Sequence, residues 1–487
     1  MLLSKVIRLL KEYKTKNFED VEIDGISYNS LLTKDRDIFI CVRGEAADGH
    51  KYAKSAVERG AAALFCEEEL DLDVPQIIVN DTKRTMAAVA AAFYDEPSKD
   101  INLIGVTGTN GKTTVTHLIQ KILEENNEKC ALIGTLGYKL SSGDAYKEAK
   151  HTTPQPPELQ RDLRLMADKD IKNVVMEVSS HALEQNRAGC CDFNGAVVTN
   201  LTQDHLDYHI TMRNYFKAKA ILFEHLKQGA FAVINADDEY AKDFISVVPE
   251  NVNTMTYGVK KDADIKASDI VFSVDGAKLT VNFADKSEKI NLHLNGMFSV
   301  YNALAAFACA LSMGIDYKVI ISALEKTKSV AGRFEIVSKK PLVIVDYAHT
   351  PDGLENVLKA ARELTPSSSN LICLFGCGGD RDTTKRPKMG KIADELSDKV
   401  VVTSDNPRSE DPQLIISDIM TGIKTVDTQR VFVEPDRHEA IKFLKTISTP
   451  DDVIVIAGKG HEDYQILKNE TVHFDDREEA KRVFVSV

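Results

Sequence analysis

The sequence lacks the features that mark membrane-spanning, secreted and nucleic-acid-binding proteins. No apolar run among its 487 residues approaches the length of a bilayer-spanning helix. No long basic run occurs and the formal net charge is −13, so we expect neither nucleic-acid binding nor membrane insertion. The first residues carry Lys5, Arg8 and Lys11 inside an apolar pattern, without an uninterrupted hydrophobic segment or a cleavage site. That pattern predicts an amphipathic helix rather than a signal peptide.

The eight cysteines also lack a functional pattern, since they show neither zinc-site spacing nor a paired framework. Most lie in apolar runs, as small buried residues do, and this usage is typical of a reducing compartment. We therefore expect a cytoplasmic protein. Hydrophobic residues make up 43% and charged residues 28%, which is ordinary for a globular protein. The length predicts two to four domains.

The most informative stretch is N-L-I-G-V-T-G-T-N-G-K-T-T, residues 102–114. An apolar run leads into Gly108 and Gly111, and a helical pattern begins at Lys112, so we expect a strand, a glycine turn and a helix start. The first turn of a helix has unpaired N–H groups and the positive end of the dipole, and glycines let a ligand approach closely. The stretch therefore predicts a nucleotide phosphate site, with Lys112 reaching the outer phosphates and Thr113 holding Mg²⁺.

The match to the standard phosphate-loop motif is not strict. Five residues separate Gly105 from Gly111, and Val106 stands where the first glycine belongs. The alternative interpretation is a glycine turn that closes a strand–helix unit without binding a ligand.

Strand and helix patterns divide the chain into three α/β units, residues 1–98, 99–329 and 330–487, with a linker at residues 96–100. In the first unit we expect strands at 37–42, 61–66 and 75–79 and helices at 52–59 and 82–94. In the second we expect strands at 102–106, 130–134, 173–178, 195–199 and 231–235, which alternate with helices. That alternation predicts a mostly parallel sheet covered on both faces, with an antiparallel excursion at 263–295.

The third unit reads as another wound α/β sheet. We expect its strands at 341–346, 370–375, 399–403, 431–433 and 453–457, and its helices at 353–364, 387–396, 414–423 and 437–444. Loops after these strands carry G-C-G-G-D-R-D, S-D-N-P-R and G-K-G-H-E. Ligands of such sheets bind beyond the carboxyl ends of the strands, so we expect these loops to converge on one crevice.

Two polar residues at predicted strand ends of the second unit could serve a metal. Glu177 ends an apolar strand and His205 follows another, so both should share the sheet edge with the phosphate loop. A carboxylate and an imidazole near a triphosphate could form a Mg²⁺ shell, although magnesium prefers oxygen. Each residue alone is more typical of a solvated or capping group.

Lys219 lies on a predicted helix in a stripe with Tyr215, Leu222 and Leu226, so a lysine occupies a largely apolar face. Sequence alone favours snorkelling, in which the ammonium reaches water. The other interpretation is a desolvated, neutral amine that reacts with CO₂ to form a metal-binding carbamate.

The S-D-N-P-R loop suits an amino-acid ligand. Arginine grips a carboxylate with a two-pronged fork, which Arg381 or Arg408 could supply, and an acidic side chain, here Glu462, grips an ammonium. A solvated loop is the alternative interpretation.

These motifs, in this order from about residue 30 to residue 465, resemble the Mur ligases: G-T-N-G-K-T-T, M-E-V-S-S-H-A-L, T-N-L-T-Q-D-H-L-D-Y-H, Y-F-K-A-K-A-I-L-F, A-G-R-F-E, V-D-Y-A-H-T-P-D, G-G-D-R-D, D-N-P-R and G-K-G-H-E. The resemblance implies a UDP-sugar domain, a central P-loop ATPase and a mobile, Rossmann-like C-terminal domain. It implies ATP and Mg²⁺ as cofactors and catalytic roles for Lys112, Glu177, His205 and Lys219. It places the metal at Thr113, Glu177, His205 and Lys219, the last as a carbamate, which reverses the preference for snorkelling.

The resemblance also implies three sets of binding residues. ATP would be bound by Gly108, Thr109, Asn110, Gly111, Lys112, Thr113, Thr114, Asn295, Arg333, Asp346 and His349. The UDP substrate would be bound by Ser30, Glu45, Ala46, Ala47, His151, Thr152, Thr153, Ser179, Gln185 and Arg187. The incoming amino acid would be bound by Arg381, Asp405, Asn406, Pro407, Arg408, Gly458 and Glu462. Two departures are Asn29-Ser30-Leu31 in place of D-S-R, and His151 where Asn is common.

The implied activity is ATP-dependent amide formation in peptidoglycan precursor synthesis, which serves the cell wall, cell shape and cell division. Meso-diaminopimelate would join the D-Glu side-chain carboxylate of UDP-MurNAc-L-Ala-D-Glu through an acyl phosphate, because D-N-P-R is typical of family members that use diaminopimelate. We expect a monomer. The rivals are the same reaction with L-lysine, a folylpolyglutamate-synthetase-like ligase, and a nucleotide-binding regulatory protein without catalysis.

Overall fold

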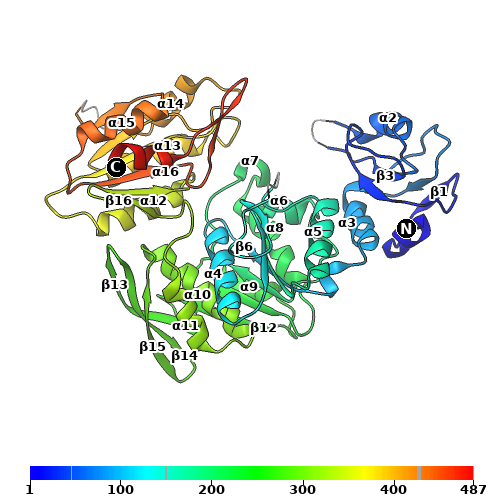
Figure 1. Cartoon of the computed structure of the whole chain (residues 1–487), viewed down its shortest axis with the longest axis horizontal. Helices are drawn as coiled ribbons and strands as arrows, with labels where there is room; N and C mark the ends of the chain where they lie inside the picture. Colours follow the sequence, from blue (N-terminus) through cyan, green and yellow to red (C-terminus); the bar gives the residue numbers. More distant parts are fainter. Residues whose placement is uncertain (45–46, 148–150, 425–428, 486–487) are drawn as a thin grey trace.

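Three α/β lobes lie in a row along the molecule, in the order in which the chain forms them (Figure 1). The computed structural model describes residues 1–44, 47–147, 151–424 and 429–485. The central lobe separates the N-terminal lobe from the C-terminal lobe (Figure 1). None of the helices in these described ranges combines the length and apolar character needed to cross a membrane.

The N-terminal lobe is built on a five-stranded sheet with the order β1-β5-β4-β3-β2, in which only β1 is antiparallel to its neighbour. The strands are β1 (Lys14–Lys16), β2 (Gly25–Ser27), β3 (Asp37–Ile40), β4 (Ala63–Cys66) and β5 (Gln76–Ile78). The helices are α1 (Leu3–Val6), η1 (Ile7–Leu9), η2 (Gly49–Tyr52), α2 (Ala53–Glu58), α3 (Thr82–Phe93) and η3 (Pro97–Lys99). Helix α3 packs against the central lobe, where the Tyr28 hydroxyl also donates to Glu158 over 2.8 Å.

The central lobe contains a ten-stranded sheet with the order β15-β14-β13-β12-β11-β10-β6-β9-β7-β8. Its parallel part runs from β7 to β13, and β8, β14 and β15 add antiparallel pairings at the two edges. The strands are β6 (Asn102–Thr107), β7 (Cys130–Gly134), β8 (Gly137–Lys139), β9 (Asn173–Glu177), β10 (Gly195–Val198), β11 (Phe231–Asn235), β12 (Asn253–Gly258), β13 (Ile265–Ser273), β14 (Gly276–Phe283) and β15 (Lys286–Leu292).

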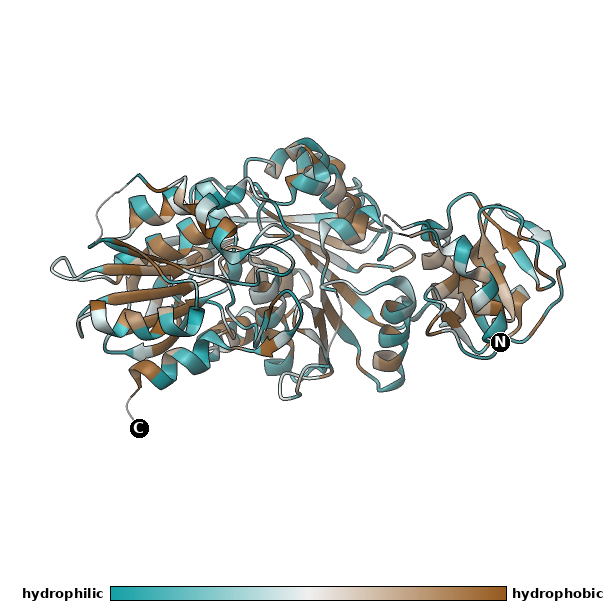
Figure 2. Cartoon of the chain, turned by 90° about the horizontal axis from the view of Figure 1, so that it is seen from above, coloured by the Kyte–Doolittle hydropathy of each residue, from teal (hydrophilic) through white to brown (hydrophobic). Residues whose placement is uncertain are grey.

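Helices cover both faces of this sheet because its central strands are apolar on both sides. Within β6, Ile104 and Val106 belong to one core and Leu103 belongs to the other. The first core also contains α4 (Lys112–Glu125), α10 (Met297–Ser312) and α11 (Tyr317–Lys326). The second contains α5 (Pro156–Asp168), α6 (Ser180–Glu184), α8 (Met212–Glu224) and α9 (Ala241–Val247), and the short α7 (Leu206–His209) packs against α8. Hydrophobic residues gather on the strands, whereas the outer helix faces are polar (Figure 2).

The C-terminal lobe contains a six-stranded sheet with the order β16-β17-β21-β18-β19-β20, parallel except for β16. Its strands are β16 (Glu335–Lys339), β17 (Leu342–Asp346), β18 (Leu371–Phe375), β19 (Lys399–Val402), β20 (Val431–Val433) and β21 (Val453–Ala457). Helices α12 (Pro351–Glu363), α13 (Lys385–Leu396) and α14 (Pro412–Met420) pack on one face, and α15 (Arg437–Ile447) and α16 (Asp476–Phe484) on the other. A separate hairpin is formed by β22 (Tyr464–Ile466) and β23 (Thr471–His473).

The sequence predictions of a mostly parallel central sheet, of its antiparallel excursion and of a second wound sheet are confirmed. The prediction of an amphipathic helix at the N-terminus is wrong in extent. Only α1 and η1 form there, and the chain turns at Leu10 into the extended conformation before β1. The predicted helix at 52–59 begins as the 3₁₀ turn η2, where the Asp48 side chain accepts a hydrogen bond from the His50 N–H.

Candidate active site

The loop between β6 and α4 is held by backbone conformations that require glycine. Gly108 has φ +142° and Gly111 has φ +87°. A Cβ atom on Gly108 would lie 1.8 Å from Thr199 Oγ1, and one on Gly111 would lie 2.4 Å from Asn302 Oδ1. The loop therefore has the glycine turn and the free helix N-terminus that a phosphate group needs.

Lys112 and Thr113 extend from the first turn of α4. The Lys112 ammonium donates to the carbonyls of Gly108 and Thr109, each over 2.9 Å, and desolvation lowers its pKa. The Thr113 hydroxyl donates to Glu177 Oε1 over 3.0 Å and accepts from Arg333 Nη2 over 3.1 Å. This hydroxyl therefore joins the phosphate loop to β9 and to the segment that leads into the C-terminal lobe.

Glu177 reaches the loop because strand register fixes its place. Its partner in the sheet is Val106, so the ends of β6 and β9 lie at the same edge. The Glu177 carboxylate also accepts from the Thr135 N–H and from the Thr135 hydroxyl, each over 3.1 Å. Oxygen atoms of Thr113 and Glu177 are the ligand type that Mg²⁺ prefers, so these two residues fit a magnesium ion. Within the described ranges, no group of three or more His, Cys, Asp or Glu side chains is arranged as a metal site.

His205 lies across the loop at the start of α7, with φ +54°. Its Nε2 is 3.3 Å from Asp204 Oδ2, and its ring meets the ring of His181 edge-on at 4.8 Å. Burial lowers the pKa of His205 to about 3, so the imidazole is neutral and could act as a ligand at neutral pH.

Lys219 is buried on α8, and its side chain is only 2% exposed. Snorkelling to solvent, which the sequence alone favoured, is therefore wrong. The ammonium donates to the Gly108 carbonyl over 2.9 Å and lies 4.6 Å from the centre of the Tyr215 ring. Burial, together with the charge of Lys112, lowers the pKa of Lys219 well below its ordinary value.

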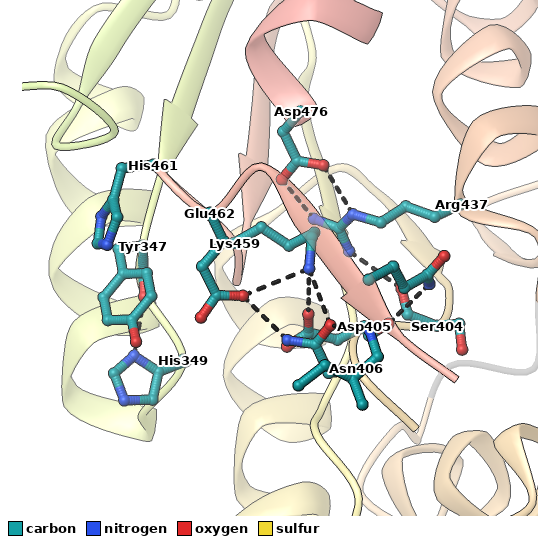
Figure 3. A network of polar contacts seen from close by, with 12 residues as sticks. Tyr347, His349, Ser404, Asp405, Asn406, Arg437, Lys459, His461, Glu462 and Asp476 are labelled. Carbon is teal, nitrogen blue, oxygen red and sulfur yellow. Dashed lines mark hydrogen bonds and ion pairs between the residues drawn. The ribbon is translucent and has the colours of Figure 1, made fainter. Parts of the chain in front are cut away.

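Arg333, at the entrance to the C-terminal lobe, meets aromatic side chains from the loops after β17 and β21. The Arg333 guanidinium stacks on the ring of Tyr347 at 4.5 Å. Tyr347 lies between His349 and His461, with ring centres 4.6 Å and 4.8 Å away (Figure 3). Burial lowers the pKa of His349 to about 4. Asp346, by contrast, is committed to the backbone, because it accepts from the N–H groups of Phe334 and Ala348 over 2.7 and 2.8 Å.

The loops after β19 and β21 meet around Asn406. Its Nδ2 donates to Glu462 Oε2 over 2.9 Å, and its Oδ1 accepts from the Ile466 N–H over 2.9 Å. Arg408 has φ +53°, and its guanidinium donates to the Gly379 carbonyl over 2.8 Å. The three loops that we expected to converge therefore do so.

One cavity of about 580 Å³ joins the phosphate loop to these C-terminal loops. The predicted residues that line it are Thr109, Asn110, Gly111, Lys112, Thr113, His151, Thr152, Glu177, Ser179, Arg187, His205, Arg333, His349, Arg381, Asp405, Asn406, Arg408, Gly458 and Glu462. Those outside its lining are Ser30, Ala47, Gly108, Thr114, Thr153, Gln185, Lys219, Asn295, Asp346 and Pro407. Glu45 and Ala46 lie outside the described residues.

Several residues outside the lining support residues in it. Thr153 donates to the Glu177 carbonyl over 2.9 Å and accepts from Arg187 through its own carbonyl over 3.2 Å. Gln185 accepts from Arg187 over 2.7 Å. Asn295 is separate, because it lies before α10 and donates to the Val274 carbonyl over 3.2 Å.

The predicted residues of the N-terminal lobe lie apart from this cavity. Ser30 is 7% exposed and Ala47 is exposed. Leu31, which replaces the arginine of D-S-R, is 70% exposed, and the following Leu32 is 62% exposed.

Among the site residues that sequence reasoning missed are His181, Asp204, Tyr347, Lys385 and Lys459. The first four line the cavity. Lys459 lies beneath it and is fully buried. The sequence carried no signal for the burial of Lys459, because its partners Asp405 and Asn406 lie on a loop that is distant along the chain.

Family models match all three lobes of the chain. They are described as "Mur ligase family, catalytic domain" for residues 22–95, "Mur ligase middle domain" for 106–310 and "Mur ligase, glutamate ligase domain" for 332–460. The UDP-N-acetylmuramoyl-L-alanyl-D-glutamate–2,6-diaminopimelate ligase of Syntrophomonas wolfei is 47% identical, over 95% of this chain and 94% of that protein. The ligase of the same name from Clostridium botulinum is 45% identical, over 98% of each chain.

A solved structure agrees with these sequence matches. It is titled as a UDP-N-acetylmuramoyl-L-alanyl-D-glutamate–2,6-diaminopimelate ligase, and it superposes with a TM-score of 0.68 at 34% identity. The match covers 95% of this chain and 94% of the other. With three family domains in order and relatives this similar along nearly its whole length, the chain belongs to the Mur ligase family.

Proposed function

We propose that this chain is an ATP-dependent ligase that joins meso-diaminopimelate to the D-Glu side-chain carboxylate of UDP-MurNAc-L-Ala-D-Glu. The observation that carries the proposal is the shared cavity, which is lined by Lys112 of the phosphate loop and by Arg408 of the D-N-P-R loop. A nucleotide, an acid and an amine can therefore meet in one space. The curated relatives carry the name of this activity.

The proposed reaction has two steps. In the first, a carboxylate oxygen attacks the γ-phosphorus of ATP, the bond to the β-phosphate oxygen breaks, and an acyl phosphate and ADP form. In the second, the amine attacks the acyl carbon, phosphate leaves, and the nitrogen loses a proton. Neither step needs an oxidant or a reductant, so placement of the reactants and neutralisation of charge supply the catalysis.

The chain's own groups divide these tasks. Lys112 and the N–H groups at the start of α4 would bind the outer phosphates, and Arg333 would add positive charge from the other side. Thr113 and Glu177 would hold Mg²⁺, with His205 and a carbamate on Lys219 as further ligands. When bound, the ion would neutralise charge on the phosphate oxygens.

The D-N-P-R loop supports diaminopimelate over L-lysine. Lysine lacks the distal carboxylate, so it would leave Arg408 without an anionic partner. Losing one partner of a buried charged pair costs roughly 2–5 kcal/mol, which is about 30- to 4,000-fold in affinity. The same loop, together with G-K-G-H-E, argues against a folylpolyglutamate-synthetase-like activity.

We also propose that the ligase works in the cytoplasm. All eight cysteines are free thiols, and six of them are buried. Burial raises the pKa of Cys130 well above its ordinary value and so keeps that thiol unreactive. Free, inert thiols fit a reducing compartment, where ATP is also available.

Phosphate release from ATP tests the proposal directly. The protein is incubated with ATP, Mg²⁺ and UDP-MurNAc-L-Ala-D-Glu, with meso-diaminopimelate, with L-lysine or without an amino acid. Release that depends on diaminopimelate is the expected result. Release with lysine alone would keep the ligase and overturn the role of Arg408, whereas no release with either amine would overturn the proposal.

A further inference from the structure

We propose that the buried ammonium of Lys459 is a positioning group that holds Asp405, Asn406 and Glu462 together as the binding site for an ammonium group of the incoming amino acid. The inference rests on the proposed function, which places the amino acid at these three side chains. Lys459 itself does not line the cavity, whereas all three of its partners do. It would therefore act on the substrate only through them.

The backbone conformation around Lys459 restricts the direction of its side chain. It follows β21 between Gly458, with φ +119°, and Gly460, with φ +56°. A Cβ atom on Gly460 would lie 2.6 Å from the Cβ of Tyr347, so this turn fits tightly against the neighbouring loop. The Lys459 side chain points inward and is 0% exposed.

Three acceptors surround the ammonium. Lys459 Nζ is 3.1 Å from Asn406 Oδ1, 3.3 Å from Glu462 Oε2 and 3.4 Å from Asp405 Oδ1 (Figure 3). An ammonium has three N–H donors and no acceptor, so each donor has one partner. The partners come from two different loops, and the lysine thereby fixes the distance between those loops.

The orientation of Asn406 depends on this arrangement. Its Oδ1 accepts from both Lys459 and the Ile466 N–H, which leaves its Nδ2 to donate to Glu462 over 2.9 Å. If the lysine were absent, the amide would lose one of the two donors that keep its oxygen inward. The Glu462 carboxylate would then lose a fixed partner as well.

The charge balance of the three side chains also supports a positioning role for Lys459. Asp405 and Glu462 together bring two negative charges, and Lys459 compensates one of them, which leaves a net single negative charge for an ammonium of the substrate. Burial and the charge of Asp405 raise the pKa of Glu462, and Lys459 opposes that rise. Without the lysine, Glu462 would take up a proton more readily and lose its attraction for a cation. The charged or titratable groups that act on Glu462 are Asp405, Lys459, Tyr347, Tyr464 and Arg437.

A buried ion pair elsewhere in the lobe serves as a contrast. Arg437 binds Asp476 in a two-pronged pair over 2.7 and 2.8 Å, with both side chains fully buried (Figure 3). It also donates to the carbonyls of Ser404 and Ala457. That pair supports the backbone beneath the site, and neither of its members lines the cavity. Lys459 differs because its partners are side chains that face the substrate.

The test compares Lys459→Gln and Lys459→Met with the wild-type ligase in the phosphate-release assay. We expect the KM for meso-diaminopimelate to rise at least about tenfold in both variants, while ATP binding and the KM for the UDP substrate stay unchanged. In the glutamine variant we expect this KM to fall as the pH rises, because Glu462 then regains its charge. A merely structural role would not produce that pH dependence.

Lys399→Gln is the matched control. Lys399 begins β19, at the opposite end of the strand that leads to Asp405, and its ammonium donates to the Ile447 carbonyl over 2.6 Å. We expect the KM values of the Lys399→Gln variant to equal those of the wild type. An unchanged diaminopimelate KM in a folded Lys459 variant would overturn the inference. The methionine variant is made in parallel so that the test remains possible if the glutamine variant does not fold. A wild-type ligase that does not use diaminopimelate would overturn the proposed function instead.

Discussion

At the residue scale, burial distinguishes lysines that the sequence presents as similar. Lys217 and Lys219 lie two positions apart on α8, yet Lys217 is exposed and Lys219 is buried against the Gly108 carbonyl. Desolvation favours the neutral amine, which is the form that attacks CO₂. In the carbamate that we propose, the nitrogen would bond to the carbon of CO₂ and lose a proton, so that a cation would become an anion suited to bind a metal.

Replacing Lys219 with alanine should therefore lower kcat by about 100-fold or more, as expected for the loss of a group that stabilises transition-state charge. Steady-state phosphate release measures the effect, and Lys217→Ala is the control that should leave kcat unchanged. Removal of CO₂ from the buffer should slow the wild-type enzyme, and bicarbonate should restore it. Near-normal turnover of the Lys219 variant would contradict the carbamate.

The residue scale is also where sequence reasoning reached its limit. The helical stripe placed Lys219 correctly on an apolar face, but depth of burial depends on what packs opposite, here the β6–α4 loop and Tyr215. Lys459 was missed for the same reason, because two of its three partners, Asp405 and Asn406, come from a loop that is distant in sequence. Contacts of this kind become visible only when the strands are in register.

At the element scale, apolar runs predicted the buried strands of the central and C-terminal sheets, because such runs are fully buried on both faces. The elements that escaped prediction are short or half-exposed. Strand β1 has three residues with only its last one partly buried, and β2 is similarly short. Pairing with neighbours, rather than local hydrophobicity, defines such strands.

The turn between β6 and α4 allows a prediction at this scale. Gly111→Ala would force an L-residue to φ +87° and place its Cβ 2.4 Å from Asn302 Oδ1. We expect a loss of about 1–2 kcal/mol of stability from the backbone and a fall in ATP affinity of at least about tenfold from the displaced loop.

Gly314→Ala is the control, because Gly314 has φ +83° at the end of α10 with no atom near its Cβ position. Thermal unfolding should show similar losses in both, and only the Gly111 variant should lose ATP affinity in calorimetry. Equal ATP affinity would show that the loop tolerates a side chain.

At the scale of the whole molecule, the cavity of the candidate active site lies where the central lobe and the C-terminal lobe meet. The residues around it come from the phosphate loop and other loops of the central lobe on one side, and from the loops after β17, β18, β19 and β21 on the other. Hydrogen bonds that span this junction include Arg333 to Thr113 over 3.1 Å, Lys388 to Gln203 over 3.0 Å and Asn110 to Asp352 over 2.7 Å. The third joins the phosphate loop itself to the first turn of α12.

We therefore expect Asp352 to couple ATP binding to the position of the C-terminal lobe. Asp352→Ala removes the acceptor of Asn110, and losing a hydrogen bond to a charged group costs about 1.5–3 kcal/mol, or about 10- to 150-fold. The lost bond joins the central lobe to the C-terminal lobe, so kcat should drop by this factor while ATP still binds. X-ray scattering of the ATP-bound variant should show a larger radius of gyration than that of the wild type. Glu355→Ala is the control, since Glu355 lies one turn along α12 and pairs only with the exposed Lys359 among the ion pairs of the described chain. If both variants kept the wild-type kcat and radius, the contact between Asn110 and Asp352 would have no part in bringing the amine to the acyl phosphate.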